Sequence, residues 1–152
     1  MELRSSRDSE FASIRTLLQD SGLPTEDLDD AAIEFIVACE QGQPVGVVGL
    51  QVFEDAGLLR SLAVQPSARN TGAGAALVRA LESRAQSAGL RQLVLLTQTA
   101  ERFFTKHGYG VIARDAAPAP VQHSTEFRSI CPSTATCMSK PLPPTPGKSS
   151  AA

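Results

Sequence analysis

Leu62-Ala63-Val64-Gln65-Pro66-Ser67-Ala68-Arg69-Asn70-Thr71-Gly72-Ala73-Gly74 is the run from which the rest of this chain is best interpreted. The mostly apolar residues 58–64 predict a buried strand that ends before Pro66, and a helical pattern begins at Gly72. Glycines in such a turn let main-chain amides approach a phosphate closely, and the first turn of the helix adds N–H donors. The run therefore predicts a pyrophosphate-binding turn, although Gly72 and Gly74 also suit a tight turn with close helix–strand packing.

Two other phosphate-binding motifs do not fit this turn. A Rossmann fingerprint needs a third glycine where this chain has Leu77, and an acidic residue after the next strand where it has Thr97. A Walker loop needs a glycine, four spacer residues and then Gly-Lys-Ser or Gly-Lys-Thr, and the sequence contains no such run. Both tests argue against a dinucleotide or nucleoside-triphosphate site of those types.

Hydrophobic patterning outward from this turn predicts the remaining elements. We expect a strand around Leu3, a helix from Phe11 to Leu18, strands over 33–39, 45–53 and 58–64, a helix over 72–88, a strand over 90–96, a helix over 100–107, and strands over 111–113 and 136–140. A hairpin turn is expected at residues 41–44. The order β-α-β-β-β-α-β-α-β-β is typical of an α+β domain with a mixed sheet.

Composition limits the class of protein. The 152 residues are 42% hydrophobic and 20% charged, which suits one globular domain, and we place it at residues 1–140. Residues 141–152 are rich in proline and predict a disordered tail. A net charge of −2 argues against nucleic acid and anionic membranes as partners. The apolar run 45–53 is too short to span a bilayer, and the polar N-terminal residues lead us to expect a cytoplasmic protein.

Two separated motifs resemble the GNAT superfamily of N-acetyltransferases. The opening run is similar to the family's Gln/Arg-x-x-Gly-x-Gly/Ala motif, preceded by a strand of the form Leu-Ala-Val-x-Pro. Residues 100–109, Ala-Glu-Arg-Phe-Phe-Thr-Lys-His-Gly-Tyr, resemble a second motif of the family, in the right order along the chain. The resemblance covers roughly residues 1–140 and implies the GNAT fold, a central, mixed and mostly antiparallel sheet flanked by helices.

The resemblance also implies a co-substrate, acetyl-CoA, with no metal. Its pyrophosphate would bind the amides from Arg69 or Asn70 to Ala75, and the main chain of Leu62 and Val64 would pair with the pantetheine arm and polarise the thioester carbonyl. The residues that the resemblance assigns to acetyl-CoA are Leu62, Ala63, Val64, Arg69, Asn70, Thr71, Gly72, Ala73, Gly74, Ala75, Thr97 and Phe104.

The sequence departs from the family at two of these positions. Many members have a tyrosine that acts as general acid where this chain has Phe104, and an asparagine where it has Thr97. We therefore expect the leaving thiolate to take its proton from water or from another group, which a thiol with a pKa of ~8–9 tolerates.

Candidates for the base and the acceptor site are less specific. Glu54 is near the position of the family's base, but an acidic residue there is also ordinary in a hairpin turn. Arg60 on the central strand is our candidate for binding an anionic acceptor, although alternation leaves its face of the sheet undecided. Glu126 and His123 are further candidates to line an acceptor pocket, and a loop histidine is also often only solvated.

A narrower resemblance concerns residues 95–104 and 126–138. Both segments look like a small GNAT branch associated with bacterial arsenic resistance, which implies acetylation of a small-molecule amine such as an arsenical or a phosphinic amino acid. Cys131 and Cys137 are compatible with binding a soft metalloid and equally with two buried thiols. The alternative function is a non-catalytic CoA-responsive or arsenic-responsive binding module on the same fold. A homodimer is compatible with the sequence.

Overall fold

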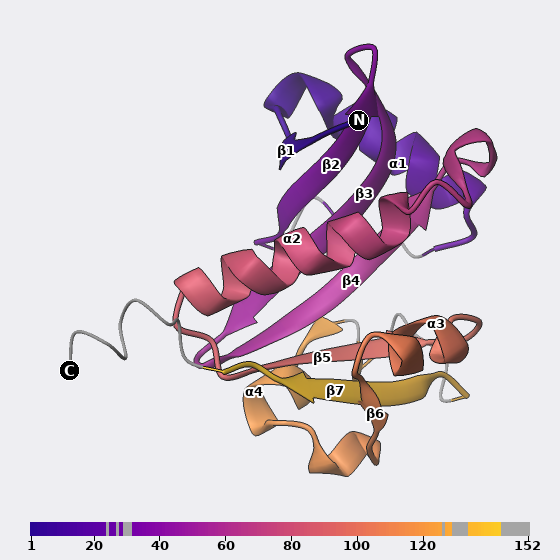
Figure 1. Cartoon of the computed structure of the whole chain (residues 1–152). Coiled ribbons are helices and arrows are strands. Elements are labelled where there is room, and N and C mark those ends of the chain that lie inside the picture. The colour runs from indigo at the N-terminus through magenta and orange to yellow at the C-terminus, as the bar shows by residue number, and fades with distance from the viewer. Residues whose placement is uncertain (24, 27, 29–31, 126, 129–133, 144–152) are drawn as a thin grey trace. The chain divides into compact units, whose positions relative to one another are not determined.

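Seven strands form one sheet in this computed structural model, which describes residues 1–143 except 24, 27, 29–31, 126 and 129–133 (Figure 1). The strand order is β1-β2-β3-β4-β5-β7-β6. The β4–β5 ladder is parallel, and the other ladders described here, β1–β2, β2–β3, β5–β7 and β6–β7, are antiparallel. The elements are β1 (Glu2–Ser5), η1 (Asp8–Glu10), α1 (Phe11–Asp20), β2 (Glu34–Glu40), β3 (Gln43–Phe53), β4 (Ala56–Val64), η2 (Pro66–Ala68), α2 (Ala73–Ser87), β5 (Gln92–Thr97), α3 (Glu101–Lys106), β6 (Gly110–Val111), η3 (Arg114–Ala116), α4 (Ala119–Gln122) and β7 (Thr136–Pro141).

This architecture confirms the predicted α+β class and the predicted order of strands and main helices. The structure adds α4, which the sequence analysis did not predict. Pro120 occupies its first turn, where the missing N–H of proline costs no helical hydrogen bond. Of the predicted tail, residues 144–152 lie outside the described residues.

The chain divides into two compact units, which we describe separately. Unit 1 comprises Met1–Gln51 and Leu59–Leu81, and unit 2 comprises Val52–Leu58 and the residues from Glu82 onward.

Unit 1 has a sheet with helices on both faces (Figure 1). On one face, α1 packs on apolar side chains that include Phe35, Val37, Val47 and Ala63. On the other face, α2 approaches β3 at Gly46, where an added Cβ would lie 3.0 Å from the side chain of Leu77. The absence of a side chain at Gly46 therefore brings the first half of α2 close to the sheet.

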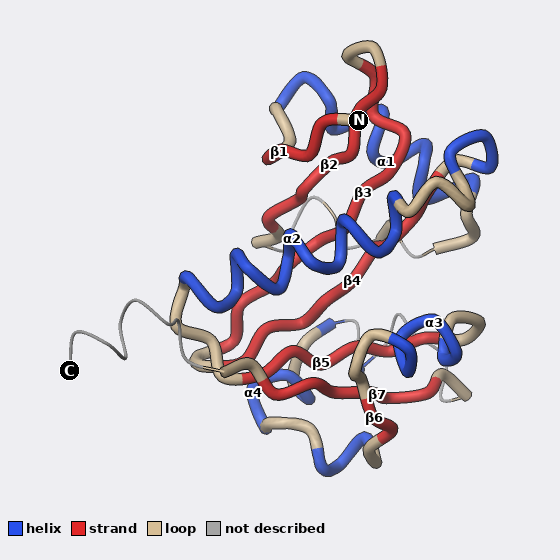
Figure 2. The backbone as a smooth tube through the Cα atoms, in the orientation of Figure 1, coloured by secondary structure: helices blue, strands red, loops and turns tan. Residues whose placement is uncertain are grey.

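Unit 2 has a second core around β5 and β7. Residues of α4 and the segments beside it cover one face through Ala117, Val121 and Phe127, which pack with Val94 and Cys137. Figure 2 shows α3 and α4 on opposite sides of these strands. The short strand β6 pairs with β7.

Candidate active site

The glycine-containing turn leads from η2 into α2. Asn70 and Gly72 both have left-handed backbones, with φ of 66° and 85°. The first helical hydrogen bond described at this end runs from the N–H of Ala76 to the carbonyl of Gly72, at 3.0 Å. The N–H groups of the preceding helical residues have no acceptor within the helix and point out of its N-terminus. This is the geometry that binds phosphate in many proteins.

The turn is held by its own hydrogen bonds. The hydroxyl of Thr71 donates to the carbonyl of Ala68, and the N–H of Gln65 donates to the carbonyl of Val45 on β3, at 2.8 Å. The guanidinium of Arg69 donates from Nε to the carbonyl of Val64, at 3.1 Å, which keeps a positive charge beside the turn. These contacts fix the conformation of the turn in which the sequence predicts anion binding.

The space next to the α-carbon of Gly72 is open. A Cβ built on Gly72 meets no atom within 4 Å, so the turn is open on the side where a side chain would project. The residues predicted to cradle a pyrophosphate thus present backbone to an open volume, which suits the anionic end of acetyl-CoA.

The strand before the turn supplies main-chain groups. The parallel ladder between β4 and β5 ends at Leu58 and Val94, so Leu62 and Val64 lie beyond it. Both side chains are half-buried, whereas Ala63 between them is buried in the core under α1. This arrangement is compatible with the predicted pairing of Leu62 and Val64 with an extended pantetheine arm, which stays a prediction.

A residue with a left-handed backbone lies in β4 directly before these residues. Ser61 has a left-handed backbone, with φ of 61°, in the middle of β4. Arg60 is buried, and its guanidinium donates to Oγ of Ser61 at 3.4 Å and to Oε1 of Gln51 at 3.3 Å. Neighbouring side chains of a regular strand point to opposite faces, so this contact between adjacent residues fits the left-handed backbone of Ser61. The hydrogen bond to Gln51 places the guanidinium of Arg60 beside β3.

The other predicted co-substrate and base residues belong to unit 2. Glu54 is exposed in the turn between β3 and β4, with φ of 59°. Thr97 accepts a hydrogen bond from the N–H of Ala100, at 3.0 Å, and so closes the turn between β5 and α3. Phe104 is buried and packs edge-on against Tyr109, with ring centroids 5.4 Å apart. Roles for Glu54, Thr97 and Phe104 in catalysis or acetyl-CoA binding stay predictions.

The candidates near the C-terminal end are placed only in part. His123 is exposed in the turn after α4, and Glu126 and Cys131 lie outside the described residues. Cys137 is buried, and burial raises the pKa of its thiol, an effect that the nearby Arg114 guanidinium partly offsets. Among the described residues, no cluster of three or more His, Cys, Asp or Glu side chains is arranged to hold a metal ion.

Unit 2 also contains a polar cluster that the sequence analysis missed. Tyr109 donates its hydroxyl to Glu82 at 2.9 Å, and the ammonium of Lys140 donates to both carboxylate oxygens of Glu82, at 3.1 and 3.2 Å, and to the carbonyl of His107, at 2.9 Å. Burial and the Glu82 carboxylate raise the pKa of Tyr109 well above its usual range. The cluster ties α2 to β7. Its residues lie far apart in the sequence, so no local pattern marks them.

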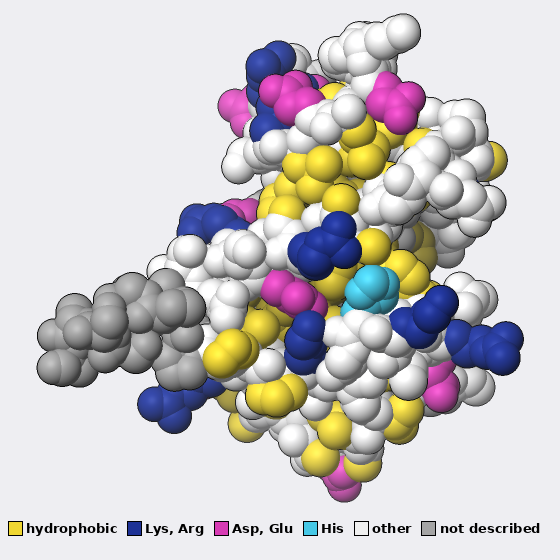
Figure 3. All heavy atoms as spheres, in the orientation of Figure 1, with side chains coloured by type: hydrophobic (Ala, Val, Ile, Leu, Met, Phe, Trp, Pro, Cys, Tyr) yellow, Lys and Arg dark blue, Asp and Glu magenta, His cyan; other side chains and the backbone are white. Residues whose placement is uncertain are grey.

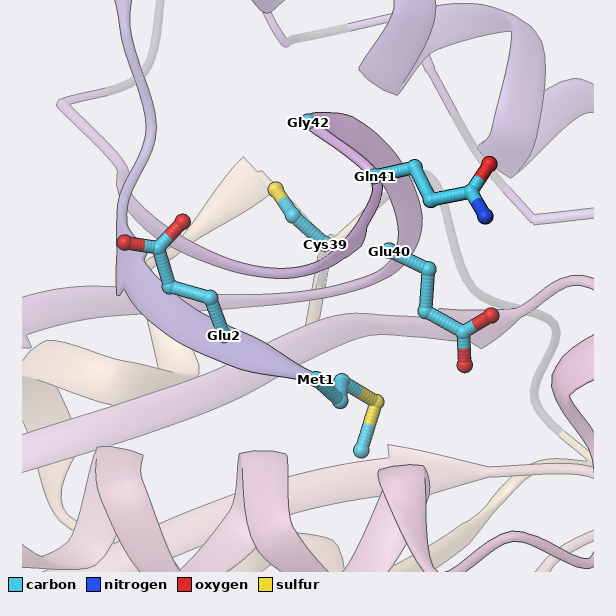
Figure 4. A pocket seen from close by; sticks show the side chains of 6 residues that line it. All are labelled: Met1, Glu2, Cys39, Glu40, Gln41 and Gly42. Carbon is cyan, nitrogen blue, oxygen red and sulfur yellow. The ribbon is translucent and has the colours of Figure 1, made fainter.

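A hollow of about 530 Å³ lies where β1 meets the β2–β3 turn (Figure 4). The side chains of Glu2 and Cys39 lie on one side of it, and those of Met1 and Glu40 on the other. Because these groups do not converge on one point, the hollow has no evident ligand set. On the face shown in Figure 3, basic and acidic side chains are interspersed, so the predicted anion binding at the turn would depend on local main-chain donors.

A strand, a glycine-containing turn and a helix on a mostly antiparallel sheet are the arrangement that the sequence predicted for an acetyl-CoA-dependent acetyltransferase. The family model described as "Acetyltransferase (GNAT) domain" matches residues 31–111, and the chain belongs to this family. It is an N-acetyltransferase whose co-substrate is acetyl-CoA. Among the described residues, no helix has the length and apolar character of a membrane span.

Three similar proteins illustrate the relationship. The uncharacterized N-acetyltransferase YjcF of Bacillus subtilis is 29% identical over 111 residues, which are 70% of this chain and 79% of YjcF. The amino-acid acetyltransferase of Azotobacter vinelandii is 33% identical over 84 residues, 55% of this chain but only 18% of that protein. The crystal structure of Rv2747 from Mycobacterium tuberculosis, in complex with CoA, is 26% identical, with a TM-score of 0.79 over 94% of this chain and all of Rv2747. The chain thus spans about a fifth of the amino-acid acetyltransferase it matches.

Proposed function

We propose that this enzyme acetylates the primary amine of a small amino acid or amino-acid-like molecule that carries an anionic group. An arsenical or a phosphinic amino acid is the acceptor class that the sequence resemblance favours. The observation that carries the proposal is the buried guanidinium of Arg60 on β4, two residues before Leu62, which Ser61 and Gln51 hold in place. A guanidinium binds carboxylate, phosphinate or arsinate groups with two parallel hydrogen bonds.

Two further observations support an anionic acceptor. A relative that is 33% identical over its matched region is named an amino-acid acetyltransferase, and an amino acid has a carboxylate next to its amine. Gln51 and Ser61 hold the guanidinium of Arg60 from its Nη1 and Nε sides. A side chain fixed in this way loses little further rotamer entropy when it binds an anion.

The proposed mechanism is direct transfer. Acetyl-CoA supplies the acetyl group as a thioester. Amides from Arg69 to Ala75 hold the pyrophosphate, and the main chain of Leu62 orients the thioester carbonyl and stabilises the negative charge that develops on its oxygen. The amine nitrogen bonds to the carbonyl carbon as the carbon–sulfur bond breaks. The nitrogen then loses a proton, for which Glu54 is the proposed acceptor, and the thiolate gains one from water because Phe104 has no proton to give.

Mass spectrometry of reaction mixtures tests this proposal. The panel contains glutamate, glutamine, amino acids with phosphinic or arsinic groups, and amines without an anionic group, such as polyamines, aminoglycosides and lysine peptides. We expect the mass gain of one acetyl group on anionic amines. Bound acetyl-CoA without any acetylated amine would instead support the non-catalytic binding module.

Arg60 variants locate the anion site. We expect Arg60→Gln to lower kcat/KM for anionic amines by roughly tenfold to a hundredfold, because two charge-assisted hydrogen bonds are lost. The affinity for acetyl-CoA should stay unchanged. Arg60→Lys keeps the charge without the planar fork and should recover only part of the loss. An equal loss for anionic and uncharged amines would show that Arg60 has a structural role instead.

A further inference from the structure

A second hollow in unit 1 has a different lining from the acidic one beside β1. Its volume is about 310 Å³, and it lies between the start of α1 and the start of β2. The floor and walls are apolar, and polar side chains occur only in the segment before α1. The lining residues are Ser6, Arg7, Asp8, Phe11, Ile14, Leu28, Ile33 and Phe35. We call this hollow the α1–β2 pocket.

The α1–β2 pocket is on the same face of the sheet as Arg60. A Cβ added at Gly49 of β3 would lie 2.9 Å from Ile33 and 3.2 Å from Phe35, and 3.3 Å from the carbonyl oxygen of Arg60. The two wall residues therefore cover β3 where it lies beside Arg60 of β4. Gln51 is two residues beyond Gly49 on β3, so it shares this face, and it contacts the Arg60 guanidinium.

The segment before α1, which forms one wall of the pocket, is held by hydrogen bonds. The N–H of Ser6 donates to the carbonyl of Phe35 at 3.0 Å. The carboxylate of Glu10 accepts two hydrogen bonds from the Arg4 guanidinium, at 2.7 and 2.9 Å, and one from the N–H of Arg7, at 2.8 Å. A pocket that exists before its ligand arrives binds apolar groups without an ordering cost.

We propose that the α1–β2 pocket binds the side chain of the acceptor, and that this side chain ends in an aliphatic or aromatic group. The proposal rests on the proposed function, because it places an anionic group of the acceptor on Arg60 and the apolar end beside it in the pocket. A volume of about 310 Å³ equals that of roughly ten water molecules in the liquid, which suits an amino-acid side chain. Phe11 and Ile33 are half-buried, so they have surface left for such a ligand.

An acceptor series that differs only in chain length tests the pocket. The series is alanine, 2-aminobutyrate, norvaline and norleucine, which share one amine and one carboxylate. Each added methylene that enters an apolar pocket should raise kcat/KM about threefold to fourfold. In Ile33→Ser we expect the norleucine value to fall roughly fivefold to tenfold while the alanine value stays within about twofold, because only the longer chain reaches this wall.

Ile36→Ser is the matched control. Ile36 is also half-buried on the same strand, but β2 alternation places it on the opposite face from Phe35. We expect this variant to keep the gradient with chain length, and Phe11→Ala to reduce it as Ile33→Ser does. Thermal unfolding identifies any variant that has lost its fold.

The outcomes separate this inference from the proposed function. Acetylation of the whole series with no gradient, or a gradient that Ile33→Ser and Phe11→Ala leave intact, would overturn the pocket assignment while the proposed function stands. No acetylation of any anionic amine in the panel would overturn the proposed function and the pocket assignment with it.

Discussion

At Gly72 the backbone has a left-handed conformation that glycine favours, and the space beside the residue is open. Its φ of 85° is in the left-handed region, and no atom lies within 4 Å of a Cβ built on it. We expect Gly72→Ala to cost about 1 kcal/mol of stability through backbone strain. The added methyl group would also occupy the position of the phosphate, so acetyl-CoA affinity should fall roughly tenfold to a hundredfold, as measured by isothermal titration calorimetry.

Gly22→Ala is the control for that measurement. Gly22 follows α1 with φ of 73°, and a Cβ there also meets nothing within 4 Å. The two variants should therefore lose similar stability, and only Gly72→Ala should bind acetyl-CoA more weakly. Equal affinities of the two variants for acetyl-CoA would show that Gly72 is not part of the binding site.

Arg60 and Ser61 show what a sequence leaves undecided at this scale. The glycine turn was predictable because glycine is the residue that a left-handed turn favours. The left-handed backbone of Ser61 was not, because serine rarely adopts a φ of 61°. The contacts of Arg60 with Ser61 and with Gln51 on β3 could therefore be established only from the structure.

At the scale of elements, an ion pair holds β1 to the segment that starts α1. Arg4 on β1 contacts Glu10 of η1 through two hydrogen bonds, and Glu10 is 9% exposed. The hydrogen bonds from the Arg4 side chain, and then that from the Arg7 N–H, lower the pKa of Glu10 from 4.5 to about 2. Because the pKa of Glu10 is lower in the folded chain than in the unfolded chain, the ionised carboxylate contributes its full stabilisation above pH 4.5. This contribution is lost as the pH falls towards 2.

Glu10→Gln should remove this pH-dependent contribution. At pH 7 we expect a loss of about 2 kcal/mol in the free energy of unfolding, measured with urea, because a buried charge-assisted pair loses one partner. The difference from the original protein should shrink as the pH falls from 4.5 to 2. Asp8→Asn on the same short helix is the control, since Asp8 is exposed. A difference that is constant over this pH range would contradict the assigned pKa.

Local sequence patterns predicted most elements of the fold. They misplaced some element boundaries and missed one short helix. The β2–β3 turn was expected at residues 41–44, but the structure closes it within Gln41 and Gly42, both with positive φ, and extends β3 back through Pro44. Proline at the start of a helix and proline in a loop look alike in a sequence. For that reason α4 was missed in a segment that the proline content marked as loop.

For the whole molecule, the sequence established the family and the co-substrate more firmly than the acceptor. Acetyl-CoA is recognised by main-chain groups, and glycine spacing is the feature that controls where the main chain is exposed. The acceptor instead meets side chains from segments far apart in sequence, such as Phe11, Ile33 and Arg60, which only the fold brings to one face. No local pattern marks such a set.

Acetyl-CoA binding should therefore stabilise the whole chain while protecting only a small part of its backbone. At a ligand concentration a hundred times Kd, linkage gives about 2.7 kcal/mol, which raises the Tm of a protein of this size by roughly 5–10 °C. Hydrogen exchange with and without acetyl-CoA should show added protection at the amides of residues 62–64 and 69–75, with little change at β1 and β2. Protection spread evenly over unit 1 would mean that the ligand tightens the unit generally, and protection absent from 69–75 would place the pyrophosphate elsewhere. Because Gly72→Ala alters the turn alone, it should diminish the protection and the Tm shift together, whereas Gly22→Ala should preserve both.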